Sequence, residues 1–223
     1  MNRTSNRGAK LAALMAVGAT AAGAAHAQVA IGGSIGTTGA AVEAQIQVLP
    51  GLQLRGGYNY FQYEADDTYD GVDYTGDLDL NSIGAFVDFH PFGNGFLITG
   101  GAFLGEKTLD LLARPANNVQ IGNQTYTPAQ VGTLGMAADL EDTAPFVGIG
   151  WDTTFENPGI AFKFIAGAMF TGSPQVNLTA TGGTLVNDPA FQAQLVQEEQ
   201  NLKDEISDYE VYPVVQAGLT LSF

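Results

Sequence analysis

The sequence predicts an all-β protein: an eight-stranded antiparallel up-and-down transmembrane β-barrel with a short helix in its last extracellular loop. Three observations predict this fold. Apolar residues alternate with small or polar residues in segments of about ten residues. The connections between these segments are short on one side and mostly long on the other, and the chain ends on the aromatic residue Phe223.

The first 27 residues have the features of an export signal. The basic residues Arg3, Arg7 and Lys10 precede the apolar run Leu11–Ala25, and Ala25-His26-Ala27 has the small-x-small pattern that signal peptidase cleaves. The apolar run is shorter than the roughly 20 residues that a membrane-spanning helix needs. We therefore expect a cleaved signal over 1–27 and a barrel over 28–223.

Four alternating segments occupy the first half of the mature chain. They are Val29–Thr37, Gly39–Val48, Leu52–Glu64 and Ser82–Phe89. Within the second segment, Val42 and Ile46 share one face, whereas Glu43 and Gln45 share the other, because side chains alternate along a strand. We expect the aliphatic and aromatic face to contact lipid and the small or polar face to point toward the barrel axis.

Four more segments follow in the second half and bring the total to eight. They are Phe96–Gly105, Phe146–Phe155, Phe162–Phe170 and Val214–Phe223. A closed barrel has no edge strand that could tolerate a proline without an N–H group. We therefore expect Pro145 and Pro213 to mark the points at which two descending strands enter the lipid.

The connections predict which end of the barrel is elaborate. Short turns at Leu49–Gly51, Pro91–Gly95 and Asn157–Gly159 contain turn-forming residues and are expected at the periplasm. Long polar stretches after Glu64, Lys107 and Thr171 are expected as outer loops. The last of these stretches is expected to contain a helix over 188–207 that packs over the barrel mouth. The signals are a cap at Asp188, Pro189 in the first turn, and helical spacing of Phe191, Leu195, Leu202 and Ile206.

A soluble β-sandwich is the competing interpretation, since it also has short alternating strands. Its outward faces would be polar. Here one face of each segment is aliphatic and aromatic, which would expose a large apolar band to water. The pattern therefore favours a barrel in the cell outer membrane.

Composition excludes several classes of function. The chain has no cysteine, which excludes disulfide scaffolds, thiol enzymes and Cys-based zinc sites. Its formal charge of −15 and isoelectric point near 4.1 argue against nucleic-acid binding, because such a chain repels phosphate.

Acidic residues concentrate in the expected outer connections, which hold 19 of the 23. The candidate rim residues are Asp66, Asp67, Asp70, Asp73 and Asp77. They form either a solvated rim or a surface that gathers divalent cations, bridges to lipopolysaccharide or concentrates cationic solutes. Residues 66–77 partly match a calcium loop, but Thr68 and Asp77 depart from that pattern and no helices flank it, so no metal or other cofactor is expected.

Charged residues are also expected inside the barrel. They are Glu43, Arg55, Asp88, Asp152 and Lys163. Glu43 and Arg55 lie within one diagonal step on hairpin-paired strands, and Asp152 and Lys163 face each other across a turn, so each couple can pair. They form either an internal brace or a solute-selecting constriction. Inward phenylalanines at 86, 103 and 146 could pack over inward glycines and close the lumen.

The mature chain has few residues that could form a catalytic site. His90 is the one histidine of the mature chain, and Asp88 and Ser222 could approach it at the periplasmic rim. A structural turn residue is the favoured interpretation of His90, and we expect no catalytic residues and no enzymatic activity.

Four motifs resemble a known family. They are Gly36–Gly39, Thr143–Trp151, Gly172–Thr179 and Tyr209–Phe223. They are similar to segments of the CarO-like outer-membrane proteins, named for an association with carbapenem resistance. The resemblance implies an eight-stranded barrel and a role in the uptake of basic amino acids such as ornithine. It carries over no binding residues.

Two functions follow as expectations. The first is a narrow passive channel for small cationic solutes, and the second is a non-conducting structural or surface-interaction barrel that acts through its acidic loops. The expected partners are outer-membrane lipid, lipopolysaccharide and the barrel assembly machinery. The last of these would recognise Phe223, because a terminal aromatic resembles the insertion signal of bacterial outer-membrane barrels.

Overall fold

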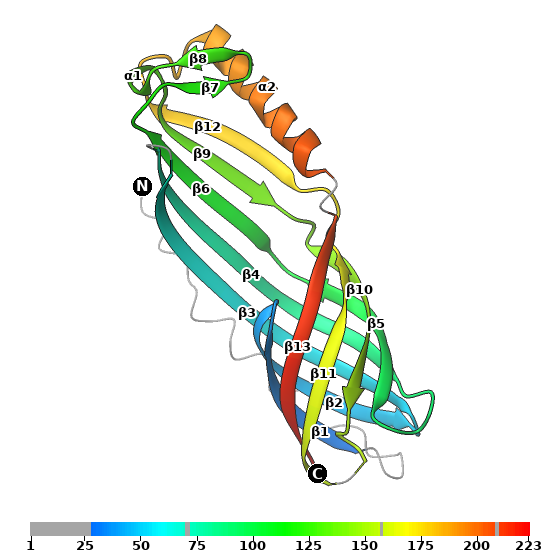
Figure 1. The fold of residues 1–223 in the computed structure, drawn as a ribbon. Helices are drawn as coiled ribbons and strands as arrows, with labels where there is room; N and C mark the ends of the chain where they lie inside the picture. The colour runs from blue at the N-terminus through cyan, green and yellow to red at the C-terminus, as the bar shows by residue number, and fades with distance from the viewer. Residues whose placement is uncertain (1–27, 70–71, 157, 208–209) are drawn as a thin grey trace.

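The fold was analysed in a computed structural model, which describes residues 28–69, 72–156, 158–207 and 210–223 (Figure 1). The expected signal over 1–27 lies outside the described residues. Among the helices of the described part of the chain, none is long and apolar enough to cross a membrane.

Eight antiparallel strands close into a barrel, as predicted. They are β1 (Val29–Gly36), β2 (Gly39–Leu49), β3 (Leu52–Tyr69), β4 (Val72–Phe89), β5 (Phe96–Leu104), β10 (Thr143–Asp152), β11 (Gly159–Phe170) and β13 (Val211–Ser222). Neighbours in this order pair with each other, and β1 pairs with β13 from Ala30 opposite Ser222 to Gly36 opposite Gln216. Closure leaves no unpaired strand edge within the barrel wall.

The two faces of the barrel wall differ as the alternation predicts. Outward side chains are apolar and exposed; Ile35 is 71% and Ile160 is 80% exposed. Inward neighbours such as Ser34 and Lys163 are buried. In water this apolar band would be strongly unfavourable, whereas acyl chains solvate it. The protein is therefore an integral outer-membrane barrel whose outward face contacts membrane lipid.

The turn between β1 and β2 requires a glycine. Gly39 has a φ of +87°, and a Cβ atom there would lie 2.2 Å from the carbonyl oxygen of Tyr60. Any side chain would therefore meet both backbone strain and a backbone clash. This requirement explains why so short an outer turn carries glycine at this position.

The two prolines lie inside their strands rather than at the start of them. Pro145 is the third residue of β10, opposite Ala102, and Pro213 is the third residue of β13, opposite Ala168. Each strand thus begins two residues before its proline, while the expectation that the prolines mark the entry of these strands into the lipid stays a prediction. A ladder can begin before a proline, because only the N–H group of the proline itself is missing.

The expected long outer loops largely form strands that continue the barrel sheet outward, which is the main correction to the sequence analysis. Strands β3 and β4 continue beyond the barrel, and β6 (Lys107–Pro115), β9 (Gly132–Asp139) and β12 (Gln175–Gly182) pair beside them in the order β12-β9-β6-β4-β3 (Figure 1). We call this the extension sheet. Its acidic residues suggested loops, but they alternate with apolar residues at the period of a strand.

Strand β4 belongs to both parts of the molecule. Its residues Ile83–Phe89 pair with β5 in the barrel, and its residues Val72–Leu80 pair with β6 in the extension sheet. β6 continues β5 along β4 in the same direction and register, and between them the backbone N–H of Asn81 donates to the carbonyl oxygen of Glu106. The barrel and the extension sheet are therefore joined by continuous backbone ladders along β3 and β4.

The polarity of the two faces reverses between these parts without a break in register. In the barrel, the inward side of β4 carries Gly84 and Asp88, and its outward side carries Val87. In the part of β4 that belongs to the extension sheet, the face that continues the inward face of the barrel carries Leu78 and Leu80. The other face of this part carries acidic residues. On β3 the change falls at Tyr60 and Phe61, which pair with Asn81 and Leu80. The polarity of the two faces therefore switches at the same level on β3 and on β4.

A small second core covers part of the extension sheet. It includes β7 (Val119–Ile121), β8 (Gln124–Tyr126), α1 (Pro128–Val131) and α2 (Pro189–Ile206). Asp188 caps α2 by accepting from the backbone N–H groups of Ala190 and Phe191. Phe191 and Leu195 are buried with Ile121, Tyr126 and Val131. The predicted helix exists, but it packs on this sheet and not over the barrel mouth (Figure 1).

Candidate functional site

An ion-pair network occupies the periplasmic half of the barrel interior. Arg55 on β3 donates from Nε and Nη2 to the two carboxylate oxygens of Asp88 on β4, at 2.7 and 3.1 Å. Its Nη2 also donates to Thr99 Oγ1 at 3.2 Å, and Nη1 lies 3.7 Å from Glu43 Oε2. Arg55, Asp88 and Glu43 are at most 8% exposed. This bidentate, desolvated geometry is typical of a strong charge-assisted pair.

The second predicted couple does not form an ion pair. Asp152 and Lys163 are directly opposite on β10 and β11, but Lys163 forms its ion pair with Glu43. Asp152 Oδ1 instead accepts from the backbone N–H of Thr154 at 2.8 Å. The amide of Gln45 fits between them when its nitrogen faces Asp152 Oδ2 and its oxygen faces Lys163 Nζ, each at 3.3 Å. Period two places Gln45 beside Glu43 on the inward face, but the sequence alone does not indicate its position between Asp152 and Lys163.

An aromatic layer lies above the network, on the extracellular side. Phe86, Phe103 and Phe146 pack edge to face, with ring centroids 5.0 to 5.6 Å apart. The guanidinium carbon of Arg55 lies 4.2 Å from the Phe86 ring centroid, so a cation–π contact joins the two layers.

Inward glycines make room for these rings. A Cβ atom at Gly101 would lie 2.6 Å from Phe86 Cδ1, and one at Gly148 would lie 2.8 Å from Phe146 Cζ. Ile165, Met169 and Val214 complete the same buried cluster. The glycine-rich face is therefore filled by phenylalanine rings rather than left open.

Within the described part of the chain, one cavity lies near each end of the barrel interior. The upper one, near Phe103 and Lys107, has a volume of 10 Å³, which is at the lower limit for a single ordered water. The lower one, at the periplasmic turns, has a volume of 120 Å³. They share no lining residue, and the aromatic and charged layers lie between them.

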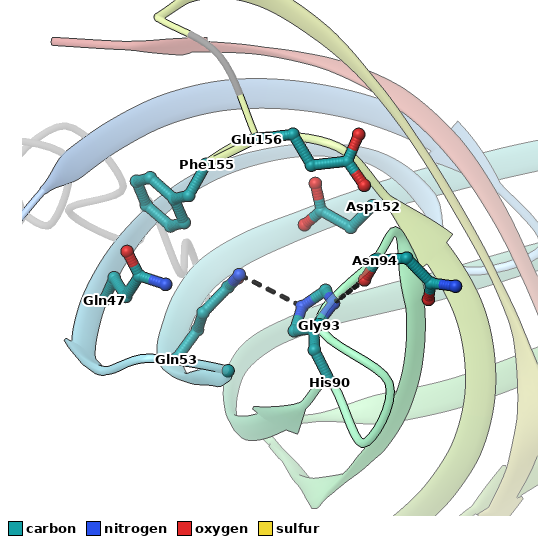
Figure 2. Close-up of a pocket in the computed structure, with 9 residues that line it drawn as sticks. Gln47, Gln53, His90, Gly93, Asn94, Asp152, Phe155 and Glu156 are labelled. Carbon is teal, nitrogen blue, oxygen red and sulfur yellow. Dashed lines mark hydrogen bonds between the residues drawn. The ribbon is translucent and has the colours of Figure 1, made fainter.

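The lower cavity is built by three short turns and the ends of their strands (Figure 2). Gln53 and His90 lie side by side, with Gln53 Nε2 3.0 Å from His90 Nε2, while His90 Nδ1 lies 3.0 Å from the carbonyl oxygen of Asn94. Asp152 and Glu156 lie on the opposite wall. Gln53 is 3% exposed, and its Oε1 atom is buried without a hydrogen-bond partner.

The possible triad of His90, Asp88 and Ser222 is not assembled. Both ring nitrogens of His90 face Gln53 and Asn94, and the carboxylate of Asp88 is held by Arg55. The Ser222 hydroxyl lies against the backbone of Gly159. This geometry offers no nucleophile next to a base.

The candidate acidic residues are in the extension sheet. Asp66, Asp67, Asp73 and Asp77 are on β3 and β4, while Asp70 lies outside the described residues. Glu64, Asp77 and Asp110 are directly opposite one another across three strands. Asp66 faces Thr75 across the hairpin, so this segment is a paired ladder rather than a calcium loop. Among the described residues, no group of three or more potential ligands is arranged to hold a metal ion.

Lys107 is a structural residue that the sequence analysis missed. It begins β6, is 3% exposed, and its Nζ donates to the carbonyl oxygens of Gly105, Glu141 and Asp142 at 2.9 to 3.2 Å. These carbonyls lie where the strands leave the barrel ladder, and the Asp142 carbonyl also accepts from the backbone N–H of Gly105. No local pattern distinguishes such a lysine from a loop lysine. At the other end, Phe223 is 72% exposed, and its role in insertion stays a prediction.

Comparisons with known proteins support the fold. No protein-family model matches the sequence, and no curated protein matches it. Among solved structures, the chain is similar to CarO2 of Acinetobacter baumannii, with a TM-score of 0.60 and 21% identity, covering 89% of this chain and 100% of that one. It is also similar to CarO of the same organism, with a TM-score of 0.55 and 22% identity, covering 87% and 97%. The chain therefore shares the fold that its sequence motifs suggested.

Proposed function

We propose that this protein is a non-conducting outer-membrane barrel that displays a folded platform, the extension sheet with its covering helix, for interactions at the cell surface. Of the two functions that the sequence left open, the filled interior favours this one. The observation that carries the proposal is the pair of stacked layers, one charged and one aromatic, between the two end cavities.

Opening a path through these layers would be costly. A solute would have to separate Arg55 from Asp88 and Glu43, and leaving one member of a buried ion pair unpaired costs about 3–5 kcal/mol. It would also have to displace Phe103 or Phe146 from an interlocked cluster, whose edge-to-face contacts each contribute about 0.5–1.5 kcal/mol. An eight-stranded barrel is just wide enough for its own side chains.

The extension sheet and α2 are held rigidly together, as a recognition surface requires. Its second core is tied to α2 by side chains that bind backbone groups: Glu198 accepts from Gly122 N, Gln194 from Asn123 N and Glu199 from Leu178 N, at 2.8 to 3.1 Å. These bonds hold the platform in one arrangement. Its acidic face, in turn, suits a cationic partner.

Reconstitution tests this proposal. Purified protein in planar bilayers should give no conductance steps, and liposomes that contain it should swell in lysine no faster than empty liposomes. A general porin reconstituted in the same way is the positive control, and heat-modifiable migration in a gel verifies that the barrel is folded. Lysine entry above the empty-liposome rate would refute the proposal and favour the cationic-solute channel.

A further inference from the structure

We propose that residues 62–68 of β3 form an open sheet edge that binds an extended segment of another protein, in which basic residues alternate with apolar ones. The inference rests on the proposed function, because it names the part of the platform that a partner would contact. Three features carry it: backbone groups on an unpaired side of the strand, exposure of both faces, and a charge pattern that selects the partner.

The barrel covers this side of β3 only over part of its length. β2 pairs with β3 from Leu49 opposite Leu52 to Ala40 opposite Tyr60, and no strand in the described part of the chain pairs with that side beyond Tyr60. Because β2 begins at Gly39, β3 continues as the outermost strand of the extension sheet (Figure 1). A bound segment would occupy the place of a longer β2.

Backbone groups of alternate residues point toward the open edge. Consecutive residues of an antiparallel strand direct their N–H and C=O groups to opposite sides. The N–H of Thr68 donates to the Asp67 carboxylate at 2.8 Å, which places it on the side away from β4. Three more residues share this orientation by alternation: Gln62, Glu64 and Asp66. Such a row of backbone groups is a template for another strand.

The opposite edge of the extension sheet is protected. There β12 is the last strand, and α2 packs along it (Figure 1). The backbone N–H of Leu178 on β12 donates to Glu199 of α2 at 3.1 Å, so the helix supplies an acceptor where a strand is missing. By contrast, each of residues 62–68 is exposed, on the acidic as well as on the apolar face. One edge of the sheet is therefore covered, and the other is accessible.

The side chains of the open edge specify the partner. Glu64 and Asp66 lie on one face, and Asp77 and Asp110 continue that face on the neighbouring strands. The other face carries Tyr63, which is 59% exposed. A strand paired here would place its residues alternately on these two faces. Basic residues on one face and apolar residues on the other therefore complement the edge.

A second copy of the chain is a poorer occupant. If the open edge paired with itself in antiparallel fashion about Ala65, Glu64 of each copy would lie opposite Asp66 of the other. Like charges directly opposite each other in a ladder are destabilising. The acidic side chains therefore oppose pairing of this edge with itself and favour a basic partner.

A dye-labelled heptapeptide of alternating lysine and valine, with lysine at both ends, is the probe. It is added to the full mature chain in phosphatidylcholine nanodiscs, and binding is followed by fluorescence anisotropy. We expect saturable binding. The same peptide with methylated backbone nitrogens on its lysines keeps its charge but cannot donate to the edge. It should bind at least about 10-fold more weakly.

Residue-resolved hydrogen exchange identifies the place of binding. The amides of Glu64 and Asp66 face the open edge, so the peptide should slow their exchange at least about 10-fold. The amide of Ala65 faces β4 and should exchange slowly with and without peptide. No saturable binding, binding without protection of Glu64 and Asp66, or equal binding of the methylated peptide would overturn the proposal.

Charge variants separate the edge from the rest of the acidic face. Glu64→Gln combined with Asp66→Asn removes two carboxylates at the edge and should weaken binding about 3- to 10-fold. Asp110→Asn combined with Asp139→Asn removes two exposed carboxylates from the same face of β6 and β9 and is the matched control, with little expected change. Equal weakening by both double variants would refute the edge as the binding site.

Two further outcomes are distinguished by the same measurements. Protection of the Glu64 amide without peptide, rising with protein concentration, would identify a second copy as the occupant and would overturn the proposal. Conductance does not enter the test, because the edge lies outside the barrel. A non-conducting chain that fails to bind the peptide would refute this inference alone, whereas a conducting chain that binds it would refute only the closed barrel.

Discussion

The barrel and the extension sheet share two strands but bury opposite faces of them. Within the barrel, β3 and β4 turn apolar side chains such as Val87 outward and hold Arg55 and Asp88 inside. Beyond Tyr60 and Asn81 the same strands place Leu78 and Leu80 on the other side. The backbone pairing of β3 and β4 is the same in both regions, whereas the medium around the strands differs. The comparison teaches that the surroundings of a strand, lipid or water, determine which face carries its apolar residues.

The largest effect should come from breaking the charged layer of the barrel. Arg55→Met leaves Asp88 and Glu43 without their shared cation, so we expect the barrel to lose about 3–5 kcal/mol of unfolding free energy. Urea unfolding in detergent, followed by tryptophan fluorescence, measures the loss. Arg114→Met on the exposed side of β6 is the matched control and should change stability by less than about 0.5 kcal/mol. Equal stability of the two variants would contradict the role assigned to the network.

A core truncation in α2, which covers the extension sheet, should separate the two regions. Leu195 is 3% exposed against the second core, so Leu195→Ala should cost this region about 2–5 kcal/mol. The barrel has its own core and should keep its stability. Hydrogen exchange would then show faster exchange in β12 and α2 and unchanged exchange in β10 and β11. Faster exchange across both regions would mean that they unfold as one unit.

Charge on the outward face should be tolerated in one region and not in the other. Val87→Arg places a cation against acyl chains and should cost about 2 kcal/mol. Asp110→Arg changes the same face in the extension sheet, at an exposed residue of β6 directly opposite Asp77, and should change stability by less than about 0.5 kcal/mol. Unfolding in lipid vesicles compares them, and equal costs would refute the proposed lipid boundary between these two positions.

The smallest effect concerns pH and the attachment of α2. The Lys203 ammonium, which donates to Glu199 at 2.7 Å, and the backbone N–H of Leu178 lower the pKa of Glu199 below its ordinary value. Because the folded pKa is depressed, this stabilisation is complete above the unfolded value of about 4.3 and is lost as the pH falls through the folded value.

Acidification should therefore loosen the contact between α2 and β12 by a few tenths of a kcal/mol. The amide of Leu178 reports this directly, since its exchange should accelerate more than that of a barrel amide such as Ile165, after correction for the intrinsic rate. In Glu199→Gln the extra acceleration at low pH should disappear. If the variant keeps the same pH dependence, another group controls the contact.

The sequence predicted the barrel well because lipid imposes a strict rule. Alternation located the eight strands, and it placed Glu43 and Arg55 within reach of each other, because neighbours on a hairpin follow from local register. The partner of Lys163 is Glu43, which closes a contact across the lumen rather than along a hairpin. No local pattern contains such a contact, since it depends on how the inward side chains share the interior.

The extension sheet was missed for a related reason. Segments such as Val72–Leu80 alternate as regularly as the barrel strands, but their second face carries Asp73, Asp77 and Asp79 in place of glycine and small polar residues. High acidity was interpreted as loop, although period two was present. The packing of α2 on this sheet could not be predicted until the sheet itself was recognised.

The level at which the face polarity of β3 and β4 switches also determines how deeply the protein is inserted in the bilayer. If the barrel rose by one pair of residues, Tyr58 and Ile83 would leave the acyl chains; if it sank by one pair, Asp79 and Gln62 would enter them. Both displacements are unfavourable, so the vertical position of the protein in the bilayer has a sharp minimum. The extension sheet is therefore held at a constant height above the lipid surface.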